Sequence, residues 1–372
     1  MRLSNNQQAL FTLLSAGLWE QDARLLQFGE INYQEVFQLA QEQSVVGIIA
    51  AGLEHIVDTV PPKIDVLSFV SSTIQLEQKN AAMNVFIAHL MKQLNTAGIS
   101  SVLVKGQGIA QCYERPLWRS CGDIDLLLDA ENYDKAKVFL TPIADRVDEE
   151  IVKRKHLGIT LHPWEIELHG TRHSELSKIV DSELDLIQQD TLGNRNVRVW
   201  QNGATTIYLP TPDNDVIFVF VHILQHFFKG GIGLRQICDW CRLMWTYRSE
   251  INVALLEQRL TRMGLMTEWK AFAALAVSHL AMPEAAMPIY SSGRKWRKKA
   301  NRIVNFVLET GNFGHNRDTS YMRKRAYLIR KSVSLWRLTY DTLTRFLIFP
   351  LDSIRMWGRM LVKGVKVVAK GK

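Results

Sequence analysis

The sequence has little cysteine and no long apolar run. Four cysteines occur among its 372 residues, and their spacing does not suggest a disulfide framework, so we expect a reducing compartment. No run of about 18 or more apolar residues is present, which argues against a transmembrane helix. Apolar residues make up 47% of the chain and charged residues 22%, which excludes a disordered chain, a collagen-like chain and a small disulfide scaffold. The run Ala9–Trp19 follows the polar Gln7 and Gln8, and we expect a first helix there and not a signal peptide.

One part of the chain carries all the excess positive charge. Residues 291–372 contain 20 Lys and Arg against 4 Asp and Glu, a net charge of +16. Residues 1–290 contain 25 against 33, a net charge of −8. The basic residues of this tail are interleaved with Trp296, Trp336 and Trp357, a pattern typical of a helix on anionic lipid. We expect a cytoplasmic protein whose tail associates with the inner face of the membrane. Nucleic acid is a less favoured partner, and a helical region packed on the body is the alternative.

Hydrophobic periodicity changes twice along the chain. Residues 1–95 have helical spacing, and a long amphipathic pattern runs from about Ile64 to Ala97. Short apolar runs bounded by turn residues then predict strands at Ser101–Val104, Ile124–Leu128, Ile159–Leu161, Glu165–His169, Val197–Trp200 and Thr206–Leu209, with a helix at Asn132–Leu140. After Pro212 the helical period returns, and helices are predicted at Asp215–Phe228, Leu234–Tyr247 and Val253–Leu280.

These patterns predict an α+β protein in four parts. A small mixed sheet with its flanking helices occupies residues 96–210. Helical regions at 1–95 and 211–290 enclose it, and a basic amphipathic helical tail occupies 291–372.

Two carboxylates mark the segment that carries chemistry. Asp123 and Asp125 lie two residues apart at the start of an apolar strand, so both side chains point to one face of the sheet. Like charges on one face repel each other unless a cation lies between them, and Mg²⁺ prefers such oxygen ligands. The pair therefore predicts a magnesium site.

A third acid would complete a site for two metal ions. Glu165 and Glu167 share a face of their predicted strand with His169, and either could join Asp123 and Asp125 if the two strands are neighbours. Two ions about 3.5–4 Å apart would then bind the attacking and leaving oxygens of a displacement at phosphorus.

The loop upstream of the two carboxylates is suited to phosphate. Gly106 and Gly108 allow backbone amides to approach a phosphate group closely. Lys105 and Arg119 offer positive charge to the same polyanion. The alternative for each cation is a salt bridge to Asp123 or Asp125 that only neutralises the site.

This combination resembles the DNA-polymerase-β-like nucleotidyltransferase superfamily. The shared features are a glycine-rich turn after a first strand, a short helix, and a Gly-Asp-apolar-Asp segment on a second strand. The version here, with Lys105-Gly106, Tyr113, Arg119 and Gly122–Leu126, looks like the bacterial uncharacterised nucleotidyltransferase family. One departure from the wider superfamily is Gln107, which stands where a serine often contacts phosphate.

The resemblance implies further site residues. The family's third acid lies in an apolar-acid-Leu-His pattern, which matches Ile166–His169 and favours Glu167 over Glu165. Its downstream helix carries two histidines four residues apart, followed by an Arg and an Asp. These match His222, His226, Arg235 and Asp239. The resemblance also implies a nucleotidyltransferase fold, and a role in surface-polysaccharide or peptide modification.

Two other motifs have simpler explanations. His222 and His226 have a spacing that can bind zinc, but no Glu general base lies between them, so a metalloprotease is not expected. Cys238 and Cys241 lie in a strongly helical stretch, and Cys112 and Cys121 have the wrong spacing to complete a zinc site. We expect core or pocket-lining histidines and buried cysteines.

The sequence as a whole predicts an enzyme that transfers a nucleoside monophosphate from an NTP to a hydroxyl or phosphate acceptor. Asp123, Asp125 and Glu167 would hold two Mg²⁺ ions, and Lys105, Gly106, Gly108, Arg119, His222 and His226 would contact the nucleotide. ATP is among the expected donors. The alternatives are a phosphoryl transferase and a non-catalytic, membrane-peripheral scaffold that keeps an old nucleotide-binding fold.

Overall fold

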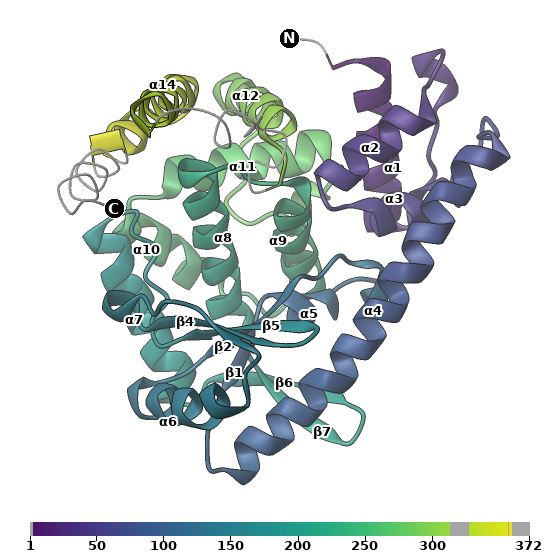
Figure 1. Ribbon diagram of the computed structural model, residues 1–372. Coiled ribbons are helices and arrows are strands. Elements are labelled where there is room, and N and C mark those ends of the chain that lie inside the picture. Colours follow the sequence, from purple (N-terminus) through teal and green to yellow (C-terminus); the bar gives the residue numbers. More distant parts are fainter. Residues whose placement is uncertain (1–2, 313–326, 356, 359–372) are drawn as a thin grey trace.

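A five-stranded mixed sheet lies beneath a set of helices, as the computed structural model shows (Figure 1). The structure describes residues 3–312, 327–355 and 357–358. The strand order is β1-β2-β5-β4-β3, in which β2 and β5 run parallel and the other neighbours run antiparallel. The strands are β1 (Val102–Val104), β2 (Asp123–Leu127), β3 (Arg146–Val147), β4 (His156–Leu161) and β5 (Trp164–His169). The predicted α+β class and small mixed sheet are confirmed.

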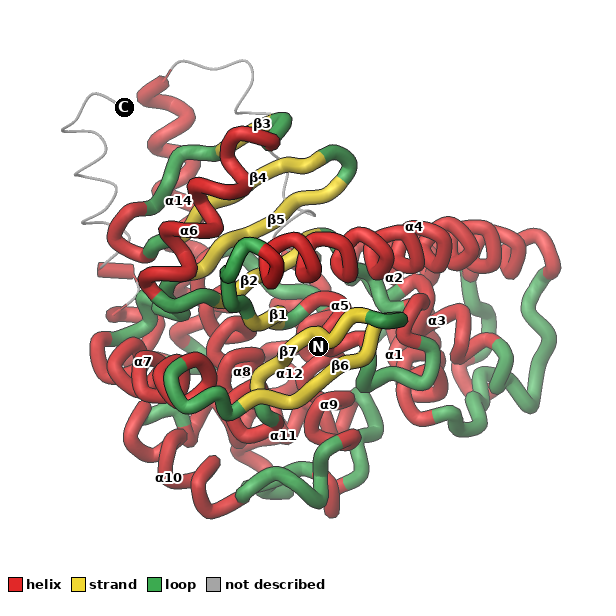
Figure 2. The backbone as a smooth tube through the Cα atoms, turned by 90° about the horizontal axis from the view of Figure 1, so that it is seen from below, coloured by secondary structure: helices red, strands yellow, loops and turns green. Residues whose placement is uncertain are grey.

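A separate hairpin extends the β region. It consists of β6 (Val197–Asn202) and β7 (Thr205–Pro210), joined through Gly203 at a positive φ of 62°. The hairpin lies next to β1 and α4 (Figure 2). Its Ile207 and Leu209 are buried with the apolar side chains of the sheet.

The N-terminal region is helical, as predicted. Its helices are α1 (Asn5–Trp19), α2 (Tyr33–Glu42), α3 (Val46–Leu53) and α4 (Lys63–Thr96). Ser4 and Gln7 form a reciprocal capping box that starts α1, because each side chain accepts the other's backbone N–H. α4 ends before Gly98, which has a positive φ of 69°. Met83, Ile87 and Leu90 of this helix are buried with the apolar side chains of the sheet and of the hairpin.

A second set of helices stands above the sheet. It contains α8 (Pro212–Lys229), α9 (Leu234–Thr246), α10 (Val253–Met263) and α11 (Met266–His279). The prediction of one helix over Val253–Leu280 is wrong, because Gly264 adopts the left-handed conformation and ends α10 there.

One helix was not predicted from the sequence. α7 (Lys178–Leu192) begins at Ser177, whose hydroxyl accepts a hydrogen bond from the Val180 backbone N–H. Buried residues at Val180, Leu184 and Ile187 have the spacing of one helical face, so the signal was present in the sequence. The predicted helix at Asn132–Leu140 is α6 (Ala130–Leu140), on the opposite side of the sheet from α8 (Figure 1).

Two apolar clusters divide the interior at the sheet. One joins α1–α3 with α8–α11 and with α12 (Arg294–Thr310). The other lies between the sheet and the helices α4 and α6. Ile124, Leu126, Ile166 and Leu168 point into this second cluster, so the alternate residues of β2 and β5 face the helices α8 and α9.

The basic tail contains the helices α12 and α14 (Tyr327–Phe346) and a further helical stretch at residues 350–355. α12 packs on α11 through a buried face that includes Ile303 and Val307. α14 is followed by Ile348 and Phe349, which are buried against the body. No helix in the described part of the chain combines the length and the apolar character needed to cross a membrane.

Candidate active site

The parallel pairing of β2 with β5 brings three carboxylates together. In this register Asp123 lies opposite Glu165, and Asp125 lies opposite Glu167. Oxygen atoms of Asp123, Asp125 and Glu167 all lie within 4.8 Å of one another. Asp125 is almost fully buried between the other two acids, which is where a ligand shared by two cations would stand.

The polar face of β5 runs from the open rim of the sheet to the interior. The Glu165 side chain is 64% exposed and lies 3.8 Å from Arg146, whereas the Glu167 side chain is 34% exposed. His169, at the inner end of the same face, is buried. The sheet register therefore places Glu167, and not Glu165, in the group of converging oxygens.

Two histidines border the carboxylates. His169 Nε2 lies 2.6 Å from Asp125 Oδ1 and 3.3 Å from Glu167 Oε2. His156 Nε2 lies 3.2 Å from the same Glu167 oxygen. His156 was not anticipated, since the predicted strand began at Ile159, and only the antiparallel register of β4 with β5 places it opposite His169.

The ligand atoms form two overlapping groups. Asp123, Asp125 and Glu167 offer the hard oxygen ligands that suit Mg²⁺. His156, Glu167 and His169 form a second possible group, and imidazole nitrogens suit Zn²⁺ and other transition metals better. The three carboxylates therefore fit the implied Mg²⁺, and the histidines act on Glu167 and Asp125 as hydrogen-bond partners.

The surroundings shift the pKa values of the three acids in different directions. The charge of Asp125, together with burial, raises the pKa of Asp123. Burial acts to raise the pKa of Asp125, but Lys105 and His169 outweigh it and hold that pKa below its ordinary value. Burial likewise opposes the hydrogen bonds from His156 and His169, which hold the pKa of Glu167 well below its ordinary range. An added cation would therefore reduce the repulsion between Asp123 and Asp125.

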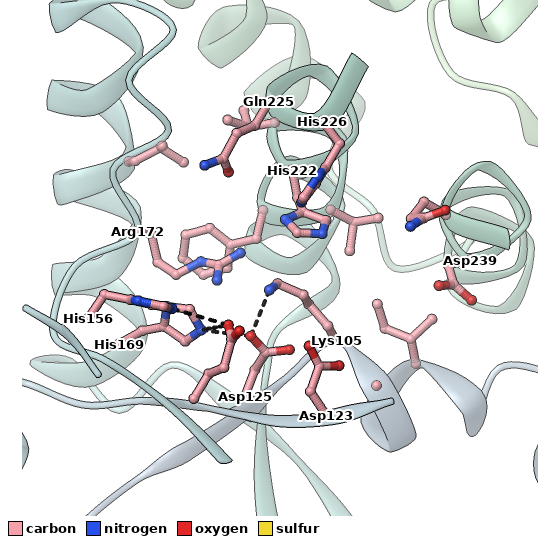
Figure 3. A pocket seen from close by; sticks show the side chains of 18 of the residues that line it. Lys105, Asp123, Asp125, His156, His169, Arg172, His222, Gln225, His226 and Asp239 are labelled. Carbon is pink, nitrogen blue, oxygen red and sulfur yellow. Dashed lines mark hydrogen bonds and ion pairs between the residues drawn. The ribbon is translucent and has the colours of Figure 1, made fainter. Parts of the chain in front are cut away.

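Lys105 forms an ion pair with the central carboxylate. Its Nζ donates to Asp125 Oδ1 over 2.7 Å, and its backbone has a positive φ of 59°. The salt bridge considered from the sequence is therefore present. The side chain also lines the cavity, where it points toward His222 (Figure 3).

The two glycines of the loop have different surroundings. Gly106 starts the short helix α5 (Gly106–Ala110), has a positive φ of 41° and lines the cavity. A Cβ atom there would lie 3.3 Å from both the Asp123 carbonyl oxygen and Cys121 Sγ, so the backbone conformation favours glycine and a side chain would also be crowded. Gly108 faces Leu209 instead and is not among the residues that line the cavity.

Arg119 is held by an acid on a distant helix. Its Nε and Nη2 donate to Asp239 of α9 over 3.0 and 2.5 Å, and the Arg119 side chain is only 5% exposed. Tyr113 also donates to Asp239, over 2.8 Å. Arg119 therefore lines the cavity as half of a buried ion pair, and Arg235, whose Nη1 donates to the Ser120 carbonyl, lies beside it.

The helix α8 forms the opposite wall of the cavity. His222, Gln225 and His226 point from it toward the carboxylates, and the two imidazole rings lie 4.3 Å apart (Figure 3). Burial and the nearby Lys105 charge lower the pKa of His226 to about 4 and that of His222 well below its ordinary value. Both rings are neutral at pH 7, which suits hydrogen bonding more than charge pairing with phosphate. Cys238 and Cys241 are buried in α9, as expected for packing residues.

The cavity between β2, β5, α5, α8 and α9 has a volume of about 340 Å³. That volume is typical of a small-molecule site. Its floor is acidic, whereas Lys105, Arg119, Arg154, Arg172 and Arg235 supply positive charge around it. This arrangement fits a polyanion that binds together with divalent cations.

Comparison with known proteins agrees with this geometry. A family model described as an uncharacterised nucleotidyltransferase matches residues 29–281, which include the sheet, the carboxylates and the α8 histidines. No curated protein matches the chain, and no solved structure matches it either. Because the match covers most of the chain, this protein belongs to the uncharacterised nucleotidyltransferase family.

Proposed function

We propose that the protein transfers a nucleoside monophosphate from an NTP to a hydroxyl or phosphate acceptor. The observation that carries the proposal is the group of three carboxylates, Asp123, Asp125 and Glu167, within 4.8 Å of one another on the floor of a cavity with cationic walls. An isolated acidic group would repel a triphosphate, whereas one loaded with divalent cations attracts it. The family assignment supports the same chemistry.

The site residues divide into three roles. Asp123, Asp125 and Glu167 would hold two Mg²⁺ ions, with Asp125 as the shared ligand, and these ions would neutralise charge that develops on the phosphate oxygens. Lys105, Gly106 and Arg119 line the cavity beside Asp123, and we assign them to the β- and γ-phosphates. His222 and His226 would contact the nucleotide from the opposite wall as neutral hydrogen-bonding groups, and Gly108 would support the loop from behind.

The reaction is a displacement at the α-phosphorus. The acceptor oxygen forms a bond to that atom, the bond to the bridging oxygen breaks, and pyrophosphate leaves with its electron pair. Glu167 lies at the end of the carboxylate group away from Gly106, where it would accept the proton of the acceptor hydroxyl. The chain contributes positioning and charge neutralisation, which dominate this class of reaction.

Nucleotide binding tests the proposal without knowledge of the acceptor. Thermal unfolding would be measured with ATP, GTP, CTP and UTP, each with and without Mg²⁺, on the wild type and on Asp125→Asn. We expect Mg²⁺-dependent stabilisation by at least one nucleotide and its loss in the variant, which keeps the shape of the side chain. The absence of any shift at millimolar nucleotide, or an equal shift in both proteins, would contradict a donor site built on Asp125.

Phosphoryl transfer is the competing enzymatic reaction. The two reactions differ in the phosphate that reaches the acceptor, so ATP or another accepted donor labelled at the α- or the γ-position separates them. Nucleotidyl transfer predicts that the product carries the α-label and that labelled pyrophosphate is released from the γ-labelled donor.

We also propose that the tail binds an anionic membrane surface on the cytoplasmic side. On α14 and just beyond it, apolar side chains are exposed at helical spacing, and Trp336, Tyr340, Leu343 and Leu347 are each more than half exposed. The opposite side is anchored, since Arg345 donates to the Phe227 carbonyl over 3.1 Å and Phe349 is buried. An exposed apolar stripe on a strongly basic segment matches an interfacial helix.

Vesicle flotation tests the membrane proposal. The full chain should float with vesicles that contain anionic lipid and should be released by high salt. Replacement of Trp336 and Leu343 by Ser should abolish flotation without loss of nucleotide binding. Equal flotation of the variant and the wild type would refute a role for this stripe. Flotation without any nucleotide binding would instead favour a membrane-peripheral scaffold.

A further inference from the structure

Arg172 is one of three cationic residues of the cavity, with Arg154 and Arg235, that the proposed reaction does not use. It lies three residues after the end of β5, and its backbone N–H donates to Gln188 Oε1 over 3.0 Å, which ties the segment to α7. Its side chain lines the cavity on the side of His156 and His169, away from Asp123 and Asp239 (Figure 3). Its guanidinium carbon lies 5.4 Å from the centre of the Phe218 ring.

The guanidinium of Arg172 has no acidic partner within the described part of the chain. Its Nε is buried and makes no hydrogen bond there. Each other arginine of the cavity has a polar partner, since Arg119 pairs with Asp239, Arg154 lies 4.0 Å from Glu175 and Arg235 Nη1 donates to the Ser120 carbonyl. The Nε of Arg154 is, however, unbonded among the described residues, like that of Arg172. Burial lowers the pKa of Arg172 below its ordinary value, whereas the negative charges of Asp125, Asp215 and Glu167 act to raise it. The guanidinium is only partly buried, but its buried Nε lacks a hydrogen bond, which is destabilising, and an incoming anion would supply that bond.

Arg172 lies on the side of the cavity assigned to the acceptor, and not on the side assigned to the donor triphosphate. Lys105, Gly106 and Arg119 lie on the Asp123 side of the cavity, where the triphosphate is assigned. Arg172 lies on the Glu167 side, where the acceptor oxygen is assigned. A guanidinium presents its N–H groups as a planar fork that binds the two oxygens of a phosphate or carboxylate.

We propose that Arg172 binds an oxyanion of the acceptor, so that the acceptor is a phosphorylated or carboxylated molecule. This inference rests on the proposed nucleotidyl transfer and narrows its substrate class. Arg172 would place the attacking oxygen at a set distance from Glu167. A neutral acceptor would leave the partly buried guanidinium without a bonded partner and would bind more weakly.

The test measures oxyanion binding to the full chain by calorimetry, at constant ionic strength. The protein is first saturated with Mg²⁺ and a non-hydrolysable analogue of the nucleotide that stabilises it. Inorganic phosphate and acetate are then titrated separately, since they represent the two classes of acceptor anion. The variants are Arg172→Gln, which removes the charge, Arg172→Lys, which keeps the charge without the fork, and Arg146→Gln as a control that removes an exposed arginine outside the cavity.

We expect the wild type to bind phosphate or acetate at least about tenfold more tightly than Arg172→Gln. Arg172→Lys should be intermediate, Arg146→Gln should match the wild type, and all four proteins should bind the nucleotide within about twofold of one another. The anion that binds more tightly identifies the class of acceptor. If Arg172→Gln does not fold, Arg172→Lys serves as the test. Weaker anion binding by Arg172→Lys than by the wild type, at unchanged nucleotide affinity, would support the same inference.

Two results would overturn the inference. A tenfold or greater loss of nucleotide affinity in both Arg172 variants would assign the residue to the donor triphosphate. Equal binding of both anions by the wild type and the variants would show that no oxyanion site depends on Arg172. If the wild type binds no nucleotide, the proposed function fails, but the same titration on the nucleotide-free protein still decides whether Arg172 holds an oxyanion.

Discussion

At the scale of single residues, Glu165 and Glu167 show how position along one strand decides what a carboxylate does. Both point to the same face of β5 and oppose an Asp of β2. Glu165 is exposed beside Arg146, whereas Glu167 accepts hydrogen bonds from His156 and His169. Because both residues are glutamates, the same substitution removes the same group at each position. A difference between the two variants therefore reports the effect of the surroundings of Glu167.

Glu167→Gln should lower kcat by about 100-fold or more, because it removes one charge from a preorganised cation site. Glu165→Gln should change kcat less than about twofold, since an exposed ion pair contributes little. Both would be compared by release of pyrophosphate, or by Mg²⁺-dependent nucleotide stabilisation where no acceptor is known. Equal effects of the two substitutions would remove Glu167 from the metal site.

At the scale of elements, the turn between β1 and α5 depends on one glycine. Gly106→Ala would place a Cβ atom 3.3 Å from the Asp123 carbonyl oxygen at a positive φ of 41°. We expect it to reduce the free energy of unfolding by about 1–3 kcal/mol and to weaken nucleotide binding. Gly122→Ala is the control, since a Cβ atom there would meet nothing within 4 Å. Denaturant unfolding of both variants would test this, and a Gly106→Ala protein as stable as Gly122→Ala would contradict it.

A buried ion pair joins the loop before β2 to the helix α9. Asp239→Asn would leave the Arg119 charge buried without its carboxylate, and we expect a loss of about 3–5 kcal/mol of unfolding free energy. The double variant Arg119→Met/Asp239→Leu should recover much of that loss, because well-packed apolar groups often replace a buried pair without cost. Urea unfolding of the single and double variants would measure both effects. A loss below about 1 kcal/mol for Asp239→Asn would show that solvent reaches the pair.

At the scale of the whole molecule, Asp352 of the basic tail lies close to a buried acid of the body, Glu268. Glu268 of α11 is 2% exposed, and burial together with the nearby Asp352 raises its pKa to about 8. An acid in the unfolded chain titrates near pH 4.3, so the native state binds more protons between about pH 4 and 8. The stabilisation from the protonated form is therefore complete below about pH 4 and is lost as the pH rises through about 8.

Glu268→Gln should abolish this dependence, because the amide remains neutral at every pH. We expect the difference in Tm between Glu268→Gln and the wild type to increase from pH 5 to pH 9 in favour of the variant. Glu309→Gln, on the exposed side of α12, should follow the wild type. Parallel Tm curves for Glu268→Gln and the wild type would show that Glu268 does not change charge in this range.

Much of the molecule follows from local sequence patterns. The period of two along Asp123–Leu127 puts both aspartates on one face, and the apolar patterns predict α4, α8 and α9 to within a few residues. Gly264 and Ser177 also carry readable signals, although a second break and an additional helix were missed there. Local patterns suffice because strand and helix faces depend on neighbouring residues.

The sequence by itself therefore determined the elements and the acidic face of β2, whereas the tertiary structure decided which distant groups meet that face. The register of β2 with β5 selects Glu167, and the register of β4 adds His156. The pairing of Arg119 with Asp239, 120 residues later, and the position of Arg172 on the opposite side of the cavity depend on how α9 and α7 pack. Side-chain contacts between distant segments are set by sheet register and helix packing, which no local periodicity encodes.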